Sequence, residues 1–155
     1  MGRITKDNYY LDIAIAVSKR STCLRRHYGC VIVKDDIIVA TGYNGSPRGE
    51  ENCCDRGTCK RKDAERYTQY ELCDSVHAEQ NALIAASRDR LIGATVYLAC
   101  ESYELDEERS KLWEEEVYDF IEDKNCLPCN ICLRMLQNAG VAKIVNRCGD
   151  IYVRN

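Results

Sequence analysis

The stretch "YGCVIVKDDIIVATGYNG", residues 28–45, decides the fold of this chain. Two runs rich in β-branched residues are separated by Lys34, Asp35 and Asp36, and a glycine-rich segment closes the second run. β-branched side chains pack well on a pleated surface, and a short polar break between two such runs is typical of a hairpin. The stretch therefore predicts two strands joined by a tight turn.

Helical and strand patterns alternate on both sides of this hairpin. Apolar residues at helical spacing predict helices at 8–21 and 76–88 and from Pro128 to Gly140, and a shorter helix around "KLWEEEVYDFI", residues 111–121. Further strands are expected at 94–99, 141–147 and 150–155. The order αββαβ(α)αββ predicts an α/β fold in which helices cover one mixed sheet.

Length and composition favour one domain over residues 1–155. With 45% hydrophobic and 30% charged residues, the chain is typical of a soluble globular protein that needs no crosslinks. No apolar run approaches the roughly 18 residues of a membrane-spanning helix, and the first residues lack a signal-peptide pattern. We therefore expect a cytoplasmic protein without a membrane partner.

Charge is distributed unevenly along the chain. Residues 101–124 form an acidic insert with eleven acidic and three basic residues, so the rest is net positive although the whole chain carries −3. The basic residues gather around loops, which suits a phosphate-bearing ligand, while a solvated surface explains any single one of them equally well. We expect the insert to point away from such a ligand. No continuous basic stripe indicates a long nucleic-acid partner.

Eleven cysteines are the compositional anomaly. An odd number of cysteines in a chain expected to be cytoplasmic favours metal binding over a disulfide framework, because cytosolic thiols are kept reduced. Cys30 and Cys100 lie in strand-like runs and are expected to fill the core as free thiols.

A metal site is predicted by two separate segments, "SVHAEQNALIAASR" at 75–88 and "CLPCNICLRML" at 126–136. Cys129 and Cys132 share one helix face, and the helix dipole at the first turn lowers the thiol pKa toward the thiolate that a metal requires. His77 would supply a third ligand. Three protein ligands and one position left to water are typical of catalytic rather than structural zinc.

Glu79 is the candidate proton carrier. Residues two apart on a helix point in different directions, but at the helix tip the side chains of His77 and Glu79 can both reach a ligand lying beyond the end. Each half of the pattern is weak alone, and a structural zinc clip is the alternative. Together the halves match the H-x-E…P-C-x-x-C signature of zinc-dependent nucleobase deaminases.

Most of the chain resembles the deoxycytidylate (dCMP) deaminase family of the cytidine deaminase-like superfamily. The successive blocks are "SKRSTC", "CVIVKDDIIVATGYNGSPRG", "NCC", "ELCDSVHAEQNALIAASR" and "PCNICLRMLQNAGVAKIV". The resemblance implies a three-layer α-β-α sandwich around a mixed sheet of about five strands. It also implies a hydrolase acting on a cyclic amidine C–N bond, which converts dCMP to dUMP and ammonia for thymidylate synthesis. Zinc is assigned to His77, Cys129 and Cys132, and proton transfer to Glu79.

The resemblance extends to the substrate. Asn44 stands where relatives contact the sugar hydroxyl, although an asparagine there also suits a left-handed turn. Ala78, beside His77, is expected to contact the substrate. A phosphate needs cations, and the candidates are Arg25, Arg48 and Arg66, because a guanidinium can make two bonds to phosphate oxygens.

Members of this family often bind a second zinc, and here the expected ligands are Cys23, Cys53, Cys59 and Cys73, with Cys54 as a competitor of Cys53. Such a site would be structural and would order the long polar loop at 44–74. "GYNG" resembles the segment linked in the family to assembly as a homo-oligomer, with a hexamer favoured, and to regulation by dCTP and dTTP with Mg²⁺.

Two alternatives stay open at this level. One is another deaminase of the same fold, acting on free cytidine or on adenosine in tRNA. The other is a zinc-stabilised scaffold of the competence type without turnover.

Overall fold

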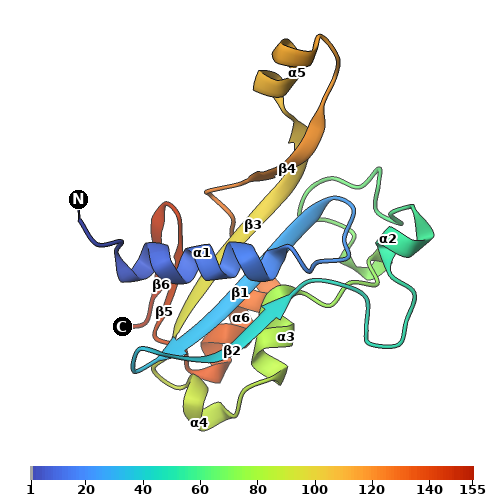
Figure 1. The fold of residues 1–155 in the computed structure, drawn as a ribbon. Coiled ribbons are helices and arrows are strands. Elements are labelled where there is room, and N and C mark those ends of the chain that lie inside the picture. The colour runs from blue at the N-terminus through green and yellow to red at the C-terminus, as the bar shows by residue number, and fades with distance from the viewer. Residues whose placement is uncertain (1) are drawn as a thin grey trace.

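The computed structural model describes residues 2–155 and contains a sheet in the order β2-β1-β3-β5-β6, to which β4 is added by pairing with β3 (Figure 1). The predicted hairpin is present: β1 (Arg26–Lys34) and β2 (Ile37–Tyr43) pair in antiparallel fashion. Asp35 and Asp36 form its turn with φ of 51° and 62°. Positive φ at both central residues matches the right-handed twist of the strands.

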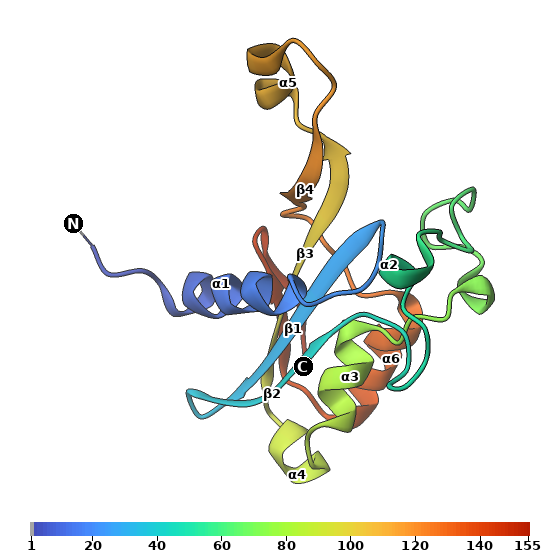
Figure 2. The same ribbon diagram turned by 45° about the vertical axis from the view of Figure 1, so that its right-hand side comes forward.

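Helices cover both faces of the sheet. Alternate residues of β1 point to opposite faces, so Val31 and Val33 pack with α1 (Lys6–Ser18), whereas Cys30 and Ile32 belong to the core beneath α3 (Ala78–Ile84) and α6 (Asn130–Ala139). Figure 2 shows α1 on one side of the sheet and α3 and α6 on the other. The expected α-β-α sandwich is confirmed.

The sheet is mixed, as predicted. β3 (Thr95–Leu105) pairs with β5 (Lys143–Asn146) in parallel, and the other pairs are antiparallel, including β5 with β6 (Gly149–Val153). A parallel pair needs a crossover, and α6 lies within it. Five strands form the path of the sheet. Cys30 and Cys100 are fully buried in its core, in accordance with their expected packing role.

The acidic insert, residues 101–124, corrects one prediction. β3 continues past its pairing with β1 and forms a hairpin with β4 (Tyr118–Glu122), with α5 (Glu107–Trp113) at the far end. We call residues 101–124 the acidic arm, since they project from the body in Figure 1. The helix expected at 111–121 is confirmed only over residues 111–113, because residues 118–121 pair with β3 as a strand. The ring of Phe120 stacks on that of His27, with 3.6 Å between the ring centroids.

The polar loop at 44–74 contains only short helices, α2 (Cys53–Arg56) and the 3-10 helix η1 (Tyr70–Leu72). The helix predicted at 76–88 is divided, because Ser87 is the N-cap residue of a second helix, α4 (Arg88–Leu91). Over residues 2–155, no helix has both the length and the apolar character needed to cross a membrane.

Candidate metal centre

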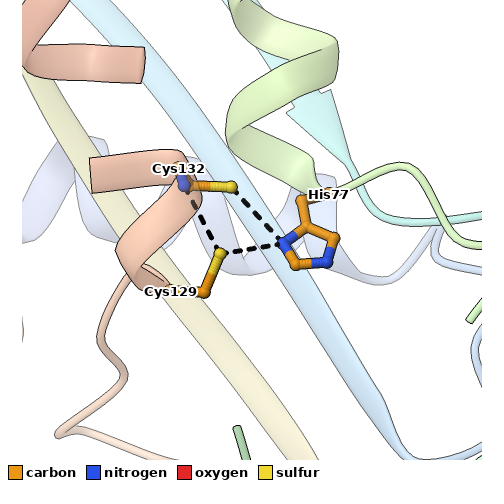
Figure 3. Close-up of side chains that lie close together, drawn as sticks. All are labelled: His77, Cys129 and Cys132. Carbon is orange, nitrogen blue, oxygen red and sulfur yellow. Dashed lines mark hydrogen bonds between the residues drawn. The ribbon is translucent and has the colours of Figure 1, made fainter. Parts of the chain in front are cut away.

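The N-terminal ends of α3 and α6 meet at one point (Figure 3). His77 is the N-cap residue of α3, and its backbone N–H donates to Gln80 Oε1 at 2.9 Å. Cys129 is the N-cap residue of α6, and its Sγ accepts from the backbone N–H of Cys132 at 3.4 Å. Both helix ends direct backbone N–H groups and positive dipole potential toward the side chains between them.

The three side chains have the spacing of zinc ligands. Nδ1 of His77 lies 3.5 Å from Sγ of Cys129 and 3.3 Å from Sγ of Cys132. A tetrahedral zinc ion with ordinary bond lengths separates its nitrogen and sulfur ligands by about 3.6 Å. In the part of the chain that the structure describes, this is the one group of metal-ligating side chains whose ligand atoms all lie within 4.8 Å of one another.

The hydrogen bonds and charges around Cys129 and Cys132 favour the thiolate form of one of these two cysteines. The pKa of Cys129 is lowered to about 4, mainly by a hydrogen bond from the Cys132 thiol and then by the neighbouring His77. The pKa of Cys132 is raised by that same bond and by burial, and the pKa of His77 is raised by its bond to Cys129. The cluster therefore holds one negative sulfur, as a cation site requires.

Glycines of "GYNG" hold α3 against the sheet. A Cβ on Gly42 would lie 2.2 Å from the carbonyl oxygen of Ala78 and 2.5 Å from the backbone nitrogen of Ala82, so only glycine permits this approach. Gly45 forms a β-bridge with Val76, immediately before His77. This segment thus fixes where the histidine lies.

Glu79 lies beside the cluster and is only 2% exposed. Burial raises the pKa of its carboxyl group. Glu79, His77, Ala78 and Cys129 line a cavity of about 130 Å³, so the predicted carboxylate and the predicted ligands open onto one space. A raised pKa makes it easier for a carboxyl group to accept a proton as well as to release one.

The wall of the same cavity is cationic and aromatic. Its lining includes Tyr28, Tyr67 and Tyr70 and four arginines, which are Arg25, Arg26, Arg61 and Arg66. Of the predicted phosphate ligands, Arg25 and Arg66 line the cavity and Arg48 does not. Arg25 uses its guanidinium to bind the carbonyl oxygens of Arg61 and Ala64, which stabilises the 44–74 loop.

Arg26 was missed at the sequence level. Its neighbour Arg25 precedes β1, whereas Arg26 is in the strand and shares a face with Tyr28, which also lines the cavity. Side chains two positions apart on a strand point to the same face. Once Cys30 is assigned to the α3 face, this rule assigns Arg26 to the same face. Arg26 and Arg66 both pair with Asp123, at 3.3 and 3.2 Å.

That pairing corrects the expectation that the whole acidic insert points away from the basic loops. The tip of the arm does so, but Asp123 at its base contacts the cavity arginines. The chain returns to the sheet there, as the backbone N–H of Asp123 donates to the carbonyl oxygen of Cys100 at 2.9 Å.

Asn44 is 7% exposed and joins the end of β2 to β1. Its Oδ1 accepts from the backbone N–H of Tyr28 at 2.8 Å, and its Nδ2 donates to the carbonyl oxygen of Arg26 at 3.0 Å. An amide has one further lone pair and one further hydrogen available, so Asn44, which also lines the cavity, retains capacity for a ligand.

Of the four cysteines predicted to bind a second zinc, Cys23, Cys59 and Cys73 line the wall of the cavity. The pKa of Cys23 is raised by burial and then by Cys59 and Cys73, and the pKa of Cys53 is raised by burial and then by Cys23. The thiols are therefore neighbours. Within residues 2–155 their sulfurs do not come together at metal-ligand distances, so this second site stays a prediction.

The fold and the site define a metalloprotein in which two helix ends present a His-Cys-Cys set beneath a cationic cavity. Residues 4–148 match the family model described as the cytidine and deoxycytidylate deaminase zinc-binding region. The chain belongs to this family. The predicted recognition and the zinc cofactor are thereby confirmed at the level of the family.

The chain is similar to proteins from yeast and bacteriophage. It is 32% identical over 152 residues to the deoxycytidylate deaminase of Mycobacterium phage D29, covering 94% of this chain and 96% of that one. It is 42% identical over 98 residues to the deoxycytidylate deaminase of Schizosaccharomyces pombe, covering 62% of this chain. This chain spans only 30% of the length of that yeast relative.

A solved structure has the same fold. The dCMP deaminase of cyanophage S-TIM5, in complex with dCMP and dUMP, superposes with a TM-score of 0.60 at 24% identity, covering 92% of this chain and 82% of the other.

Proposed function

We propose that this chain is a zinc-dependent hydrolase that converts dCMP to dUMP and ammonia. The observation that carries the proposal is a buried carboxyl group, Glu79, beside the His77–Cys129–Cys132 cluster at a cavity whose wall is lined by arginines. Relatives named deoxycytidylate deaminase and the dCMP- and dUMP-bound structure of a protein with the same fold support this substrate.

The residues divide the chemistry between them. His77, Cys129 and Cys132 would hold zinc, which, when bound, supplies Lewis-acid activation of water. Glu79 transfers one proton of the attacking water to the ring nitrogen of cytosine and the second, from the added hydroxyl group, to the departing amine. Water supplies the oxygen of the uracil carbonyl group, and the C4–N bond breaks to release ammonia. The raised pKa of Glu79 suits a group that must carry a proton in both directions.

The cavity wall suits a nucleoside monophosphate. We place the sugar beside Asn44 and the phosphate beside Arg26 and Arg66, because a guanidinium can make paired hydrogen bonds to phosphate oxygens. Ala78 lies between the zinc ligand and Glu79 and would contact the base.

Glu79→Gln tests the mechanism. Loss of the proton carrier is expected to lower kcat by about two to four orders of magnitude while zinc content stays the same. Steady-state kinetics with dCMP and elemental analysis measure the two effects. The control is Glu71→Gln, an exposed glutamate outside the cavity lining, which is expected to retain activity.

Full activity of the Glu79→Gln protein would contradict the mechanism. The scaffold alternative, in contrast, predicts that wild-type protein releases no ammonia from any nucleotide. A panel of dCMP, deoxycytidine, cytidine and a tRNA anticodon stem-loop distinguishes it from the other deaminases. Equal kcat/KM for dCMP and deoxycytidine would reject the monophosphate as the preferred substrate.

We propose that a second, structural zinc is held by Cys23, Cys53, Cys59 and Cys73. Three of the four, Cys23, Cys59 and Cys73, line the same cavity wall, which supports this assignment. Two zinc ions per wild-type chain and one per Cys59→Ser/Cys73→Ser chain are expected in elemental analysis. One zinc ion per wild-type chain would eliminate this site and leave the catalytic site unaffected.

We also propose, from the family resemblance, a homo-oligomer with a hexamer favoured, and regulation by dCTP and dTTP with Mg²⁺. Sedimentation measures the first, and initial rates with each effector measure the second. A cytoplasmic location and a single domain over residues 1–155 stay predictions.

A further inference from the structure

We propose that Asp123, from the base of the acidic arm, is a positioning residue that holds Arg26 and Arg66 together as one phosphate-binding pair. This inference rests on the proposed function. It assigns to the arm a role in distinguishing a nucleoside monophosphate from a nucleoside.

The contacts of Asp123 point to this role. Its Oδ2 accepts from Nη2 of Arg26 at 3.3 Å and from Nη2 of Arg66 at 3.2 Å. Its Oδ1 accepts from the backbone N–H of Asn125 at 3.1 Å, so the carboxylate is also tied to its own turn. Its side chain is 22% exposed. One oxygen therefore fixes the carboxylate, and the other bridges two cations.

Both arginines are held by a further contact. Nη1 of Arg26 donates to the hydroxyl oxygen of Tyr28 at 3.2 Å, and the guanidinium of Arg66 lies 4.8 Å from the centroid of the Tyr67 ring. Each guanidinium carries five N–H donors, so donors remain for a ligand after these contacts are made. Arg26, Arg66 and the two tyrosines all line the cavity that contains His77 and Glu79.

The carboxylate resolves an electrostatic conflict. Two guanidinium groups that share one carboxylate oxygen repel each other. A bridging carboxylate offsets that repulsion before a ligand arrives. The bridged group carries a net charge near +1 and so still attracts a phosphate dianion. Preorganised cations lose less conformational entropy on binding.

Asp123 differs from the other acids of the arm. Asp106 and Asp119 pair with Arg109 inside the arm, and Glu122 pairs with Arg147 on the body. Among the residues that the structure describes, Asp123 is the arm acid paired with arginines of the cavity.

The test compares Asp123→Asn with wild-type holoenzyme on dCMP and deoxycytidine. Asparagine keeps an oxygen for the Asn125 N–H but loses the charge that holds the arginines. KM for dCMP is expected to rise about tenfold, with a smaller change in kcat, and the preference for dCMP over deoxycytidine is expected to fall by a similar factor. Asp123→Glu should restore part of that preference.

Asp119→Asn is the matched control, because Asp119 is in the same hairpin, is half exposed and, within residues 2–155, forms its ion pair with Arg109. It is expected to leave both substrates unaffected. A lower KM for dCMP in Asp123→Asn would show that the carboxylate only repels phosphate and would overturn the inference. An unchanged preference would also overturn it. If wild-type protein lacks dCMP turnover, the proposed function fails instead, and the binding of inorganic phosphate to wild type and Asp123→Asn then decides the inference: equal affinity rejects it.

Discussion

Cys129 and Cys132 are chemically unequal although they lie in the same first turn of one helix. Cys129 caps the helix, receives hydrogen bonds from Cys132 and lies against His77, so its pKa is lowered to about 4. Cys132 donates in that arrangement, and its pKa is raised. A chain that has not yet bound zinc therefore already carries one thiolate at neutral pH, which lowers the cost of taking up the ion.

Metal-free protein provides the test at this scale. A lowered pKa means that the Cys129 thiolate persists as pH falls below the usual thiol pKa of about 8.5 and disappears only near pH 4. Thiolate absorbance at pH 6 is expected in wild type and lost in Cys129→Ser. Cys23→Ser, which removes a thiol whose pKa is raised by burial, should leave the absorbance at pH 6 intact.

Residue patterns predicted the His-Cys-Cys cluster but only part of the cavity wall. His77, Cys129 and Cys132 were found because metal ligation and helix ends restrict both residue type and spacing. Arginines carry no such spacing rule. Arg25 and Arg26 are adjacent in sequence, yet Arg25 binds loop carbonyl oxygens and Arg26 pairs with Asp123, 97 positions away. These different roles are determined by the folded loop and arm.

At the scale of elements, two glycines let helices approach opposite faces of the hairpin. Gly42 admits α3, and Gly29 admits α1, where an added Cβ would lie 1.9 Å from the carbonyl oxygen of Ala14. Both contacts are with backbone atoms, which cannot move aside as a flexible side chain can. The two positions differ in one respect: α3 begins directly after His77, whereas α1 contains none of the predicted zinc ligands.

A comparison of Gly42→Ala with Gly29→Ala tests the effect of this difference between α3 and α1. Each is expected to lower the free energy of unfolding by about 1–3 kcal/mol, because the added methyl group forces a helix away from the sheet. Only Gly42→Ala should also weaken zinc binding, by about tenfold, since it displaces the support of His77. Chemical denaturation and competition with a zinc chelator measure the two effects. Equal zinc affinity in the two variants would contradict this account.

The elements themselves were largely predictable, with two exceptions: the helix at 76–88 is divided, and residues 118–121 form a strand. The hairpin and the helices follow from strong periodicity and clear turn residues. Residues 118–121 were expected to belong to a short helix, but Tyr118 and Phe120 pair with the extension of β3. Strand pairing of this kind depends on a partner distant in sequence, which local patterns do not contain.

For the whole molecule, the arm divides into a base that touches the cavity and a tip that does not. Leu105 and Tyr118 are paired across the hairpin, so residues 106–117 can be replaced by Asn-Gly, which favours a two-residue turn. None of the removed residues lines the cavity. Zinc content and dCMP turnover are therefore expected to stay unchanged, as elemental analysis and kinetics would show.

Loss of turnover in that variant, with zinc retained, would indicate that the arm tip contributes to activity from outside the cavity. Leu112 and Trp113 at the tip are 78% and 65% exposed, so sedimentation of the shortened protein also reports whether they contribute to the proposed oligomer.

The meeting of α3 and α6 has a consequence for how the protein acquires its metal. His77 and Cys129 are 52 positions apart in the sequence, and β3 and the acidic arm, which includes β4, lie between them. A zinc ion bound there would link residues 77 and 129 and close the intervening chain into a loop. Uptake at this cluster must consequently wait until α6 has folded back, because a nascent chain that ends before Cys129 contains only His77 of the three side chains.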